Sequence, residues 1–278
     1  MDQSLKLDDN QDPTIKTNCK SSTTSDSEGS PPHEIKKWGC KGKLVPSYYF
    51  QPVAAIDSGK LRMTNVSVYS TTPWKEANFI SRTIVNFFKD SNTPQAPSTN
   101  KTLNIINLSQ KPKNLKGCPP LPIVITDATA NIGGNTISFY LNGLTSVNAV
   151  EMDELTCEIL KHNLSVYQLP TQNVHCCDYL SIYKQFVQDV VFLDPPWGGP
   201  DYKKATLLDL YLGENPSVNI IDICAQLFEE NKVKMIVLKL PINYNLPGLM
   251  SRLPKKSFLT HKIYRHQYHS YNVVYIWG

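Results

Sequence analysis

The sequence lacks the features that would place a protein in a membrane or outside the cell. No apolar stretch approaches the 18 or more residues that span a bilayer. The N-terminal region is polar and acidic and has no apolar core of a secretory signal, so we expect an intracellular protein. The seven cysteines are scattered and form no C-x-x-C motif, so we expect reduced thiols, no disulfide framework and no metal site.

Charge is distributed unevenly along the chain. Residues 1–35 contain three lysines and seven acidic residues, with few apolar side chains to bury, so we predict a disordered acidic tail. The remaining chain has 25 basic and 17 acidic residues, a net charge of +8. That sign favours a polyanionic partner, nucleic acid first. A basic surface that only maintains solubility is the alternative.

Residues 36–122 are predicted to form a small N-terminal helical subdomain with a mobile proline-rich insert. A threonine at the N-cap, Pro73 in the first turn and apolar residues on one face indicate a helix within 70–88. Residues 90–122 hold six prolines among polar residues, which is typical of a long loop, here with one short strand at 103–108.

Strands alternate with helices over residues 123–278, which we predict to form one domain. The order indicates an α/β fold with a Rossmann-like, doubly wound and mostly parallel sheet. The last two strands read as an antiparallel pair, which is usual in methyltransferases of the S-adenosylmethionine type and unusual in dehydrogenases. The predicted strands are 122–128, 146–153, 173–180, 189–194, 233–241 and a pair within 258–277, and the predicted helices are 134–142, 154–166, 217–231 and 246–252.

Acidic and glycine residues follow successive strands of this domain. Asp127 ends the first strand, and Gly133 and Gly134 then let the backbone approach a ligand at the start of a helix. Glu151 ends the second strand, where a carboxylate can bind both hydroxyls of a ribose, and Asp178 ends the third, where it can meet an adenine amino group. A complete G-x-G-x-x-G motif is missing, which suits a cofactor without a pyrophosphate. Ordinary turn chemistry is the alternative for the glycine pair.

The fourth strand runs into D-P-P-W-G-G-P-D-Y, residues 194–202. The Asp194 carboxylate and a rigid proline carbonyl can accept both hydrogens of an exocyclic base amine and thereby aim its lone pair. Pro195 and Pro196 fix the backbone and remove competing donors. Trp197 offers a stacking face worth about 1–3 kcal/mol. The stretch predicts direct methyl transfer to a base amine, with a strand-exit turn and a core tryptophan as the alternative.

These residues resemble the trimethylguanosine synthase family. The likeness covers about residues 65–278 and rests on P-P-W-G-G-P-D-Y, D-A-T-A-N-I-G-G-N-T-I-S-F-Y-L, A-V-E-M-D, K-L-P-I-N-Y-N and Y-S-T-T-P. It implies a Rossmann-like class I S-adenosylmethionine-dependent methyltransferase that modifies the N2 amine of 7-methylguanosine RNA caps. The implied cofactor is S-adenosyl-L-methionine and the implied partner is a capped RNA. We expect a monomer that binds no membrane and works in the nucleus or the cytoplasm.

The resemblance also implies roles for individual residues. Those expected at the methyl-transfer point are Asp194, Pro195, Pro196 and Trp197, with Asp194 orienting the amine and taking its proton. The expected cofactor-binding residues are Asp127, Thr129, Asn131, Gly133, Gly134, Asn135, Thr136, Glu151, Met152, Asp178, Tyr179 and Asp194. The expected substrate-binding residues are Trp197, Tyr202, Asn243 and Thr72.

The sequence departs from the family's pattern at several positions. Asp194 stands where the family commonly has serine, as in the D-P-P-Y/W pattern of adenine-N6 enzymes, and the insert at 90–122 is long. Asn131 replaces a glycine of the cofactor loop, and Ile242 replaces an arginine. The basic residues that could replace this arginine are Lys203, Lys204, Lys255, Lys256, Arg265, His261, His266 and His269. Two other functions therefore stay open: methylation of another exocyclic amine (adenine N6 or guanine N2) of RNA or DNA, and a non-catalytic cap-binding module.

Overall fold

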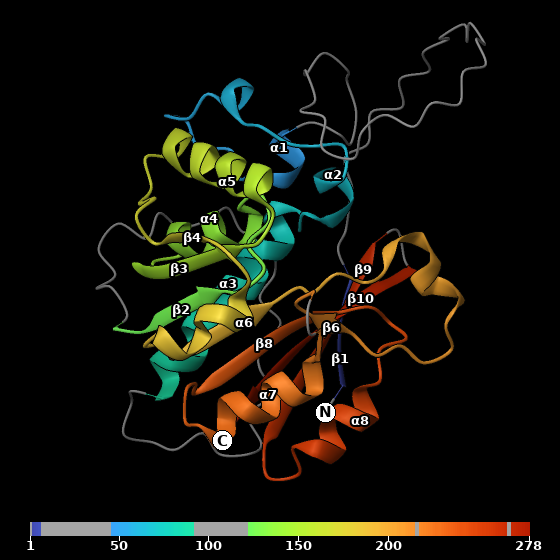
Figure 1. Cartoon of the computed structure of the whole chain (residues 1–278). Coiled ribbons are helices and arrows are strands. Elements are labelled where there is room, and N and C mark those ends of the chain that lie inside the picture. The colour runs from blue at the N-terminus through green and yellow to red at the C-terminus, as the bar shows by residue number, and fades with distance from the viewer. Residues whose placement is uncertain (1, 7–45, 92–121, 215–216, 266–267) are drawn as a thin grey trace, which may run out of the picture.

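The computed structural model describes residues 2–6, 46–91, 122–214, 217–265 and 268–278. Its main element is a mostly parallel β-sheet. Its eight strands lie in the order β1-β9-β10-β8-β5-β2-β3-β4 (Figure 1). Neighbours are parallel, except that β10 runs antiparallel to both β8 and β9, as predicted for a C-terminal strand. The strands are β1 Asp2–Lys6, β2 Val124–Asp127, β3 Ser146–Glu151, β4 Val174–Cys176, β5 Val190–Leu193, β8 Met235–Leu240, β9 Ser257–Arg265 and β10 Tyr268–Trp277, with β6 Tyr211–Leu212 and β7 Val218–Asn219 in a separate pair.

Helices cover both faces of the central strands, which explains why these strands are apolar throughout. Val190 and Phe192 of β5 contribute to one core cluster, and Val191 and Leu193 to another, as the two-residue period of a strand requires. The first cluster includes apolar residues of α3 and α4, and the second includes those of α7 and α8. These helices are α3 Trp74–Ser91, α4 Gly134–Leu141, α7 Ile220–Glu229 and α8 Leu246–Arg252.

The segment before α3 packs on α5, Glu154–Val166, as Figure 1 shows for α1. Tyr49, Phe50 and Met63 share a buried cluster with Leu160 of α5, so this segment adds to the core of the domain. Within the described ranges, no helix combines the length and apolarity needed to cross a bilayer. The remaining short helices are α1 Pro46–Tyr49, η1 Ser58–Lys60, α2 Ser67–Ser70, α6 Tyr179–Ile182, η2 Tyr183–Gln185 and η3 Gly199–Lys204.

Two sequence-based predictions need correction. Asp2–Lys6, which we assigned to the disordered tail, forms β1 beside β9, because backbone hydrogen bonds to an open strand edge need no apolar side chains. The strand predicted for 173–180 ends at Cys176, because the chain turns into α6 there. Residues 7–35 of the predicted tail and the predicted strand at 103–108 lie outside the described residues.

Candidate active site

The carboxyl end of β2 places Asp127 between β3 and β5, at the middle of the sheet. Asp127 is fully buried; its Oδ2 accepts a hydrogen bond from Thr136 Oγ1 at 2.6 Å, and its Oδ1 has no partner among the described residues. Burial raises the pKa of Asp127 to about 7, with a further contribution from the nearby Asp194 carboxylate. A buried carboxylate with an unused oxygen favours a ligand that donates a hydrogen bond or carries positive charge.

The loop between β2 and α4 is held against the end of β3. The Glu151 carboxylate accepts the backbone N–H groups of Asn131 at 2.8 Å and Asp153 at 2.9 Å, and burial raises its pKa. Asn131 has a φ of 48°, a conformation that asparagine tolerates better than most residues, so it can replace the family's glycine. At Gly133, with a φ of 99°, a Cβ would lie 2.9 Å from Leu160 Cδ1, so the loop fits closely over α5.

The residues just before α3 lie on the N-terminus of α4. A Cβ on Gly134 would lie 2.7 Å from Thr71 Cγ2, so this close approach requires glycine. Asn135 Nδ2 donates to Thr72 Oγ1 at 3.1 Å. In the part of the chain that the structure describes, Asn135 Oδ1 and Thr71 Oγ1 are buried without a partner. Both threonines are buried, and of the two Thr71 lines the cavity next to Trp197, whereas the predicted role of Thr72 in substrate binding stays a prediction.

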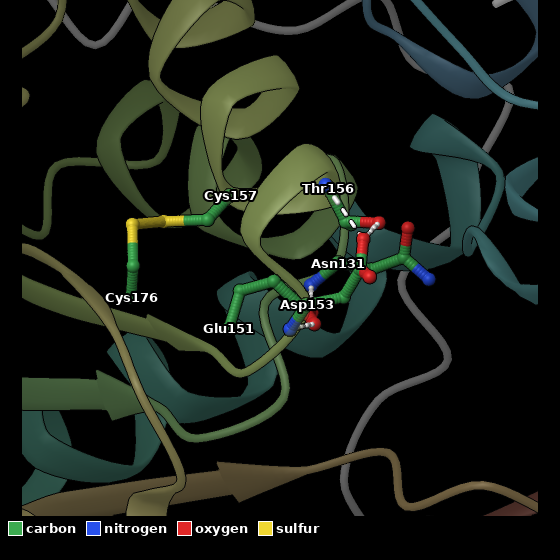
Figure 2. The surroundings of a disulfide bond; sticks show 6 residues. All are labelled: Asn131, Glu151, Asp153, Thr156, Cys157 and Cys176. Atoms are coloured by element: carbon green, nitrogen blue, oxygen red, sulfur yellow. Dashed lines mark hydrogen bonds between the residues drawn. A yellow bond between two sulfur atoms is a disulfide. The ribbon is translucent and has the colours of Figure 1, made fainter. Parts of the chain in front are cut away.

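A disulfide joins Cys157 of α5 to Cys176 of β4 (Figure 2). The prediction of reduced thiols is therefore wrong for these two residues. The crossover from β3 to β4 brings the two Cα atoms within 5.7 Å, and this proximity depends on the fold, so the sequence separation of 19 does not reveal it. Cys176 is the register partner of Glu151, so the disulfide ties α5 to the strand beside that carboxylate.

The remaining predicted cofactor residues lie in different surroundings. Met152 is exposed, and Asp178 follows β4, where one carboxylate oxygen caps α6 by accepting the Leu180 N–H at 2.9 Å. Tyr179 is a core residue, because its ring is buried and its hydroxyl accepts a hydrogen bond from Gln188 Nε2 at 3.0 Å. The Tyr179 ring therefore belongs to the core, and the predicted role of this residue in cofactor binding stays a prediction.

A cavity of about 520 Å³ has Trp197 in its wall. The partly buried indole meets the Tyr202 ring edge-on, with centroids 5.3 Å apart. Asn243 Nδ2 donates to the carbonyls of Tyr202 and Ala205 at 2.8 and 2.7 Å, which fixes the amide and leaves Oδ1 buried with no partner in the described chain. The predicted substrate residues Trp197, Tyr202 and Asn243 are therefore brought together. The lining also includes Thr71, Lys203, Lys239, Ile242, Arg265 and Tyr271.

Asp194 connects the end of β2 with this pocket. Its backbone N–H donates to Thr129 Oγ1 at 2.7 Å, and its Oδ2 accepts from Lys239 Nζ of β8 at 2.6 Å. Burial raises the pKa of Asp194, and the Lys239 ammonium opposes this rise. Lys239 Nζ also lies 5.5 Å from the Trp197 ring centroid and 5.2 Å from that of Tyr271. Sequence reasoning missed Lys239, because one lysine in an apolar strand gives no signal of a buried pair.

A second ion pair, between Glu76 and Arg265, supports the pocket lining. The buried Glu76 of α3 accepts hydrogen bonds from Arg265 Nε at 2.8 Å and Arg265 Nη2 at 2.7 Å, and also from the Tyr271 hydroxyl. This two-pronged ion pair ties α3 to β9 and holds Arg265 at the pocket. The sequence carried no signal for it, since Glu76 and Arg265 are 189 residues apart.

Some of the basic residues considered as replacements for the family's arginine reach the pocket. Lys203 and Arg265 line it. His261 is buried, and burial lowers its pKa to about 4, so it is neutral at pH 7. Lys204, Lys255 and Lys256 are not among the lining residues, and the side chains of His266 and His269 lie outside the described set. Across the described ranges, no three His, Cys, Asp or Glu residues are grouped to hold a metal ion.

The unused acceptors at the strand ends fit S-adenosyl-L-methionine. This cofactor offers ribose hydroxyls, an ammonium group and a positively charged sulfur. Asp127 Oδ1 and Asn135 Oδ1 are buried acceptors without partners in the described chain, and such a ligand would satisfy them.

Comparisons with known proteins show which proteins this chain is similar to. The chain is 30% identical over 216 residues to uncharacterized protein L320 of Acanthamoeba polyphaga mimivirus, covering 77% of this chain and 78% of that protein. It is 31% identical over 151 residues to trimethylguanosine synthase of Schizosaccharomyces pombe, covering 52% of this chain and 49% of that enzyme, so the match spans about half of the yeast protein. A T. thermophilus 16S rRNA N2 G1207 methyltransferase, solved with AdoMet and guanosine, is 16% identical with a TM-score of 0.43, covering 57% of this chain and 38% of that one.

The family follows from a match to more than half of the chain. A model described as RNA cap guanine-N2 methyltransferase matches residues 123–276. The predicted fold class, a Rossmann-like class I S-adenosylmethionine-dependent methyltransferase, is confirmed by the strand order together with this match. The expected cofactor, S-adenosyl-L-methionine, agrees with the strand order and with the family match. The chain belongs to the RNA cap guanine-N2 methyltransferase family.

Proposed function

We propose that this protein transfers methyl groups from S-adenosyl-L-methionine to the N2 amine of 7-methylguanosine RNA caps, giving di- or trimethylguanosine. The position of Asp194 carries the proposal. Its backbone bonds to Thr129 at the end of β2, and its carboxylate bonds to Lys239 in the wall of the pocket that contains Trp197. One acceptor thus lies between the proposed cofactor loop and a stacking face, where an amine has to be held for in-line transfer.

The pocket offers groups that suit a 7-methylguanosine cap. The methylated base is a cation, which favours stacking on the Trp197 indole. Asn243 Oδ1 is a fixed acceptor that suits the N–H groups on the Watson–Crick edge of guanine. Lys203 provides positive charge for the cap phosphates, since Ile242 has replaced the family's arginine.

The proposed mechanism divides the work between the strand ends. Asp127, Glu151 and Asp178 hold the cofactor, which supplies an electrophilic sulfonium methyl group when bound. Asp194 accepts an N–H of the base amine, orients the nitrogen lone pair, and takes the proton that the amine loses after transfer. Pro195 is buried and rigid, so the carbonyl beside the amine keeps a fixed direction.

Mass analysis of a 7-methylguanosine cap dinucleotide, incubated with the full chain and S-adenosyl-L-methionine, tests the proposal. We expect a product heavier by one or two methyl groups. An unmethylated guanosine cap and uncapped oligonucleotides run in parallel. Methyl transfer to uncapped adenine or guanine would support the alternative enzyme, and absence of cofactor binding by calorimetry would support a non-catalytic cap-binding module.

A tryptophan variant provides the matched test of base stacking. Trp197→Ala should raise the KM for the capped dinucleotide by about 5- to 150-fold, the equivalent of about 1–3 kcal/mol. Tyr211→Ala removes a partly exposed aromatic ring that is not among the pocket residues, and it should leave KM unchanged. Equal KM values for Trp197→Ala and the unmodified protein would argue against stacking on this indole.

A further inference from the structure

Lys239 is a buried cation in the interior of a sheet strand. It is 5% exposed, and its neighbours Leu238 and Leu240 are 0% and 1% exposed. A charge removed from water in this way destabilises a fold unless it is paired. Its partner is Asp194, with Nζ and Oδ2 2.6 Å apart and side chains 7% and 14% exposed.

The ammonium of Lys239 is held from more than one side. Trp197 and Tyr271 present their rings at centroid distances of 5.5 and 5.2 Å, within the range of cation–π attraction. The third contact of the ammonium is Asp194 Oδ2, which lies 2.6 Å from Lys239 Nζ. Because Lys239, Trp197 and Tyr271 line the pocket and Lys239 bonds to Asp194, Lys239 fixes the position of Asp194 relative to the stacking face.

The charged groups that face Asp194 come from the strands around it. Lys239 of β8 and Arg265 of β9 favour the ionised carboxylate, whereas Asp127 of β2 repels it, and Tyr271 of β10 is neutral. Glu76 already neutralises Arg265 through two hydrogen bonds. Without the Lys239 ammonium, burial beside Asp127 would favour a protonated Asp194, which donates a hydrogen bond where the base amine needs an acceptor.

We infer that Lys239 is a positioning residue for methyl transfer, whose ammonium holds the Asp194 carboxylate ionised and in place with an oxygen available to the substrate amine. This inference rests on the proposed function of the same site. It also accounts for two departures from an ordinary strand and turn: a carboxylate at position 194 and a lysine inside β8. A purely structural ion pair, in which Lys239 only completes the packing, is the competing explanation.

The pH dependence of kcat for Lys239→Met separates the two explanations. Methionine has a similar length and suits an aromatic surrounding, so the fold should be retained. We expect kcat at pH 7 to fall by about 30-fold or more, and the acidic limb of the profile to move to higher pH by more than one unit, with most of the activity restored near pH 9. Lys234→Met is the matched control, because Lys234 pairs with Asp189 at 2.8 Å while 70% exposed, and its profile should match that of the unmodified protein.

Two outcomes would overturn the inference. One is a Lys239→Met profile that keeps the original shape and is lowered by the same factor at every pH, which indicates a packing role. The other is unchanged activity. A folded variant is verified by its unfolding midpoint and by calorimetric binding of S-adenosyl-L-methionine, which should change less than threefold.

A titration without substrate keeps this inference separable from the proposed function. Tryptophan fluorescence against pH should contain a component from Asp194 ionisation that is absent in Asp194→Asn and shifts to higher pH in Lys239→Met. Equal midpoints in Lys239→Met and the unmodified protein would refute the role of Lys239. Failure of the unmodified protein to methylate any base would refute the proposed function, while the shifted titration would still support control of Asp194 by Lys239.

Discussion

The proposed cofactor side and the proposed base side of the site are built in different ways. The cofactor side comes from one stretch of chain, from Asp127 to Asp178, in which each strand end is followed by a loop that the next element holds in place. The base side is assembled from α3, β8, β9, β10 and the turn after β5, through contacts between residues far apart in sequence. A local motif therefore defines one side, and long-range pairs define the other.

The two sides also differ in how their charges are matched. On the base side, Asp194 pairs with Lys239, and Glu76 pairs with Arg265. On the cofactor side, Asp127 has an oxygen without a partner among the described residues, and burial raises its pKa to about 7. The charged side chains named on the base side are thus paired with each other before a ligand binds. On the cofactor side, a cationic ligand would supply the missing partner of the Asp127 carboxylate.

The largest effect should come from removing the unmatched carboxylate. Asp127→Ala should weaken S-adenosyl-L-methionine binding by roughly 4 kcal/mol, close to a thousandfold, because a buried charge pair with the ligand is lost. Calorimetry with the purified chain measures this directly. Asp222→Asn, an exposed acid on α7, is the control and should bind as the unmodified protein does. Equal affinities for Asp127→Ala and the control would remove Asp127 from the cofactor site.

The next largest effect is expected from removing the disulfide between α5 and β4. Replacing Cys157 and Cys176 together by serine should lower the free energy of unfolding by about 3 kcal/mol, since the closed loop spans 19 residues. Urea unfolding measures this, and Cys177→Ser is the control because that neighbouring thiol is free. An excess of reductant should reproduce the loss in the unmodified protein. Identical unfolding curves with and without reductant would show that this bond does not stabilise the fold.

On the base side, Glu76→Gln should lower the free energy of unfolding by about 2 kcal/mol. The change leaves Arg265 and Tyr271 at the pocket without the buried charge that they share. Glu229→Gln is the matched control, because Glu229 and Arg252 are 63% and 47% exposed and such a pair contributes less than about 1 kcal/mol. Comparable losses for both variants would mean that the base side does not depend on its buried pair.

The difference between the two sides also explains what the sequence could predict. Asp127, the glycine pair and Glu151 were recognisable because each follows an apolar strand by a fixed short spacing, and the strand order of a parallel sheet then brings them together. Trp197, Tyr202 and Asn243, which line one pocket, were predicted through a motif and its resemblance. The side chains of Thr72 and Tyr179 are buried, which the sequence pattern did not indicate, because the direction of a side chain next to a turn depends on that turn.

The sequence did not predict the pairs formed by Lys239, by Glu76 and by the two disulfide cysteines, and the reason is the same for all three. Each depends on a partner that only the packed fold brings near, at separations of 45, 189 and 19 residues. A lysine in an apolar strand and a glutamate in the first turn of a helix both have ordinary local explanations. Hydrophobic periodicity identifies which residues are buried, but it does not identify which buried charges meet.

The smallest effect, in the pH dependence of cofactor binding, tests the charge difference itself. With a pKa of about 7, Asp127 is about one tenth ionised at pH 6 and about nine tenths ionised at pH 8, so affinity for S-adenosyl-L-methionine should rise roughly tenfold over that interval. Because the folded state binds the proton more tightly than the unfolded state does, Asp127 should stabilise the ligand-free fold below pH 3.8 and lose this contribution as the pH rises through about 7. Calorimetry and urea unfolding across pH 5 to 8.5 measure the two trends, which should run in opposite directions. In Asp127→Asn, neither the affinity nor the free energy of unfolding should depend on pH in this way. Trends that persist in this variant would assign the titration to another group, and the two sides would then not differ in how their charges are matched.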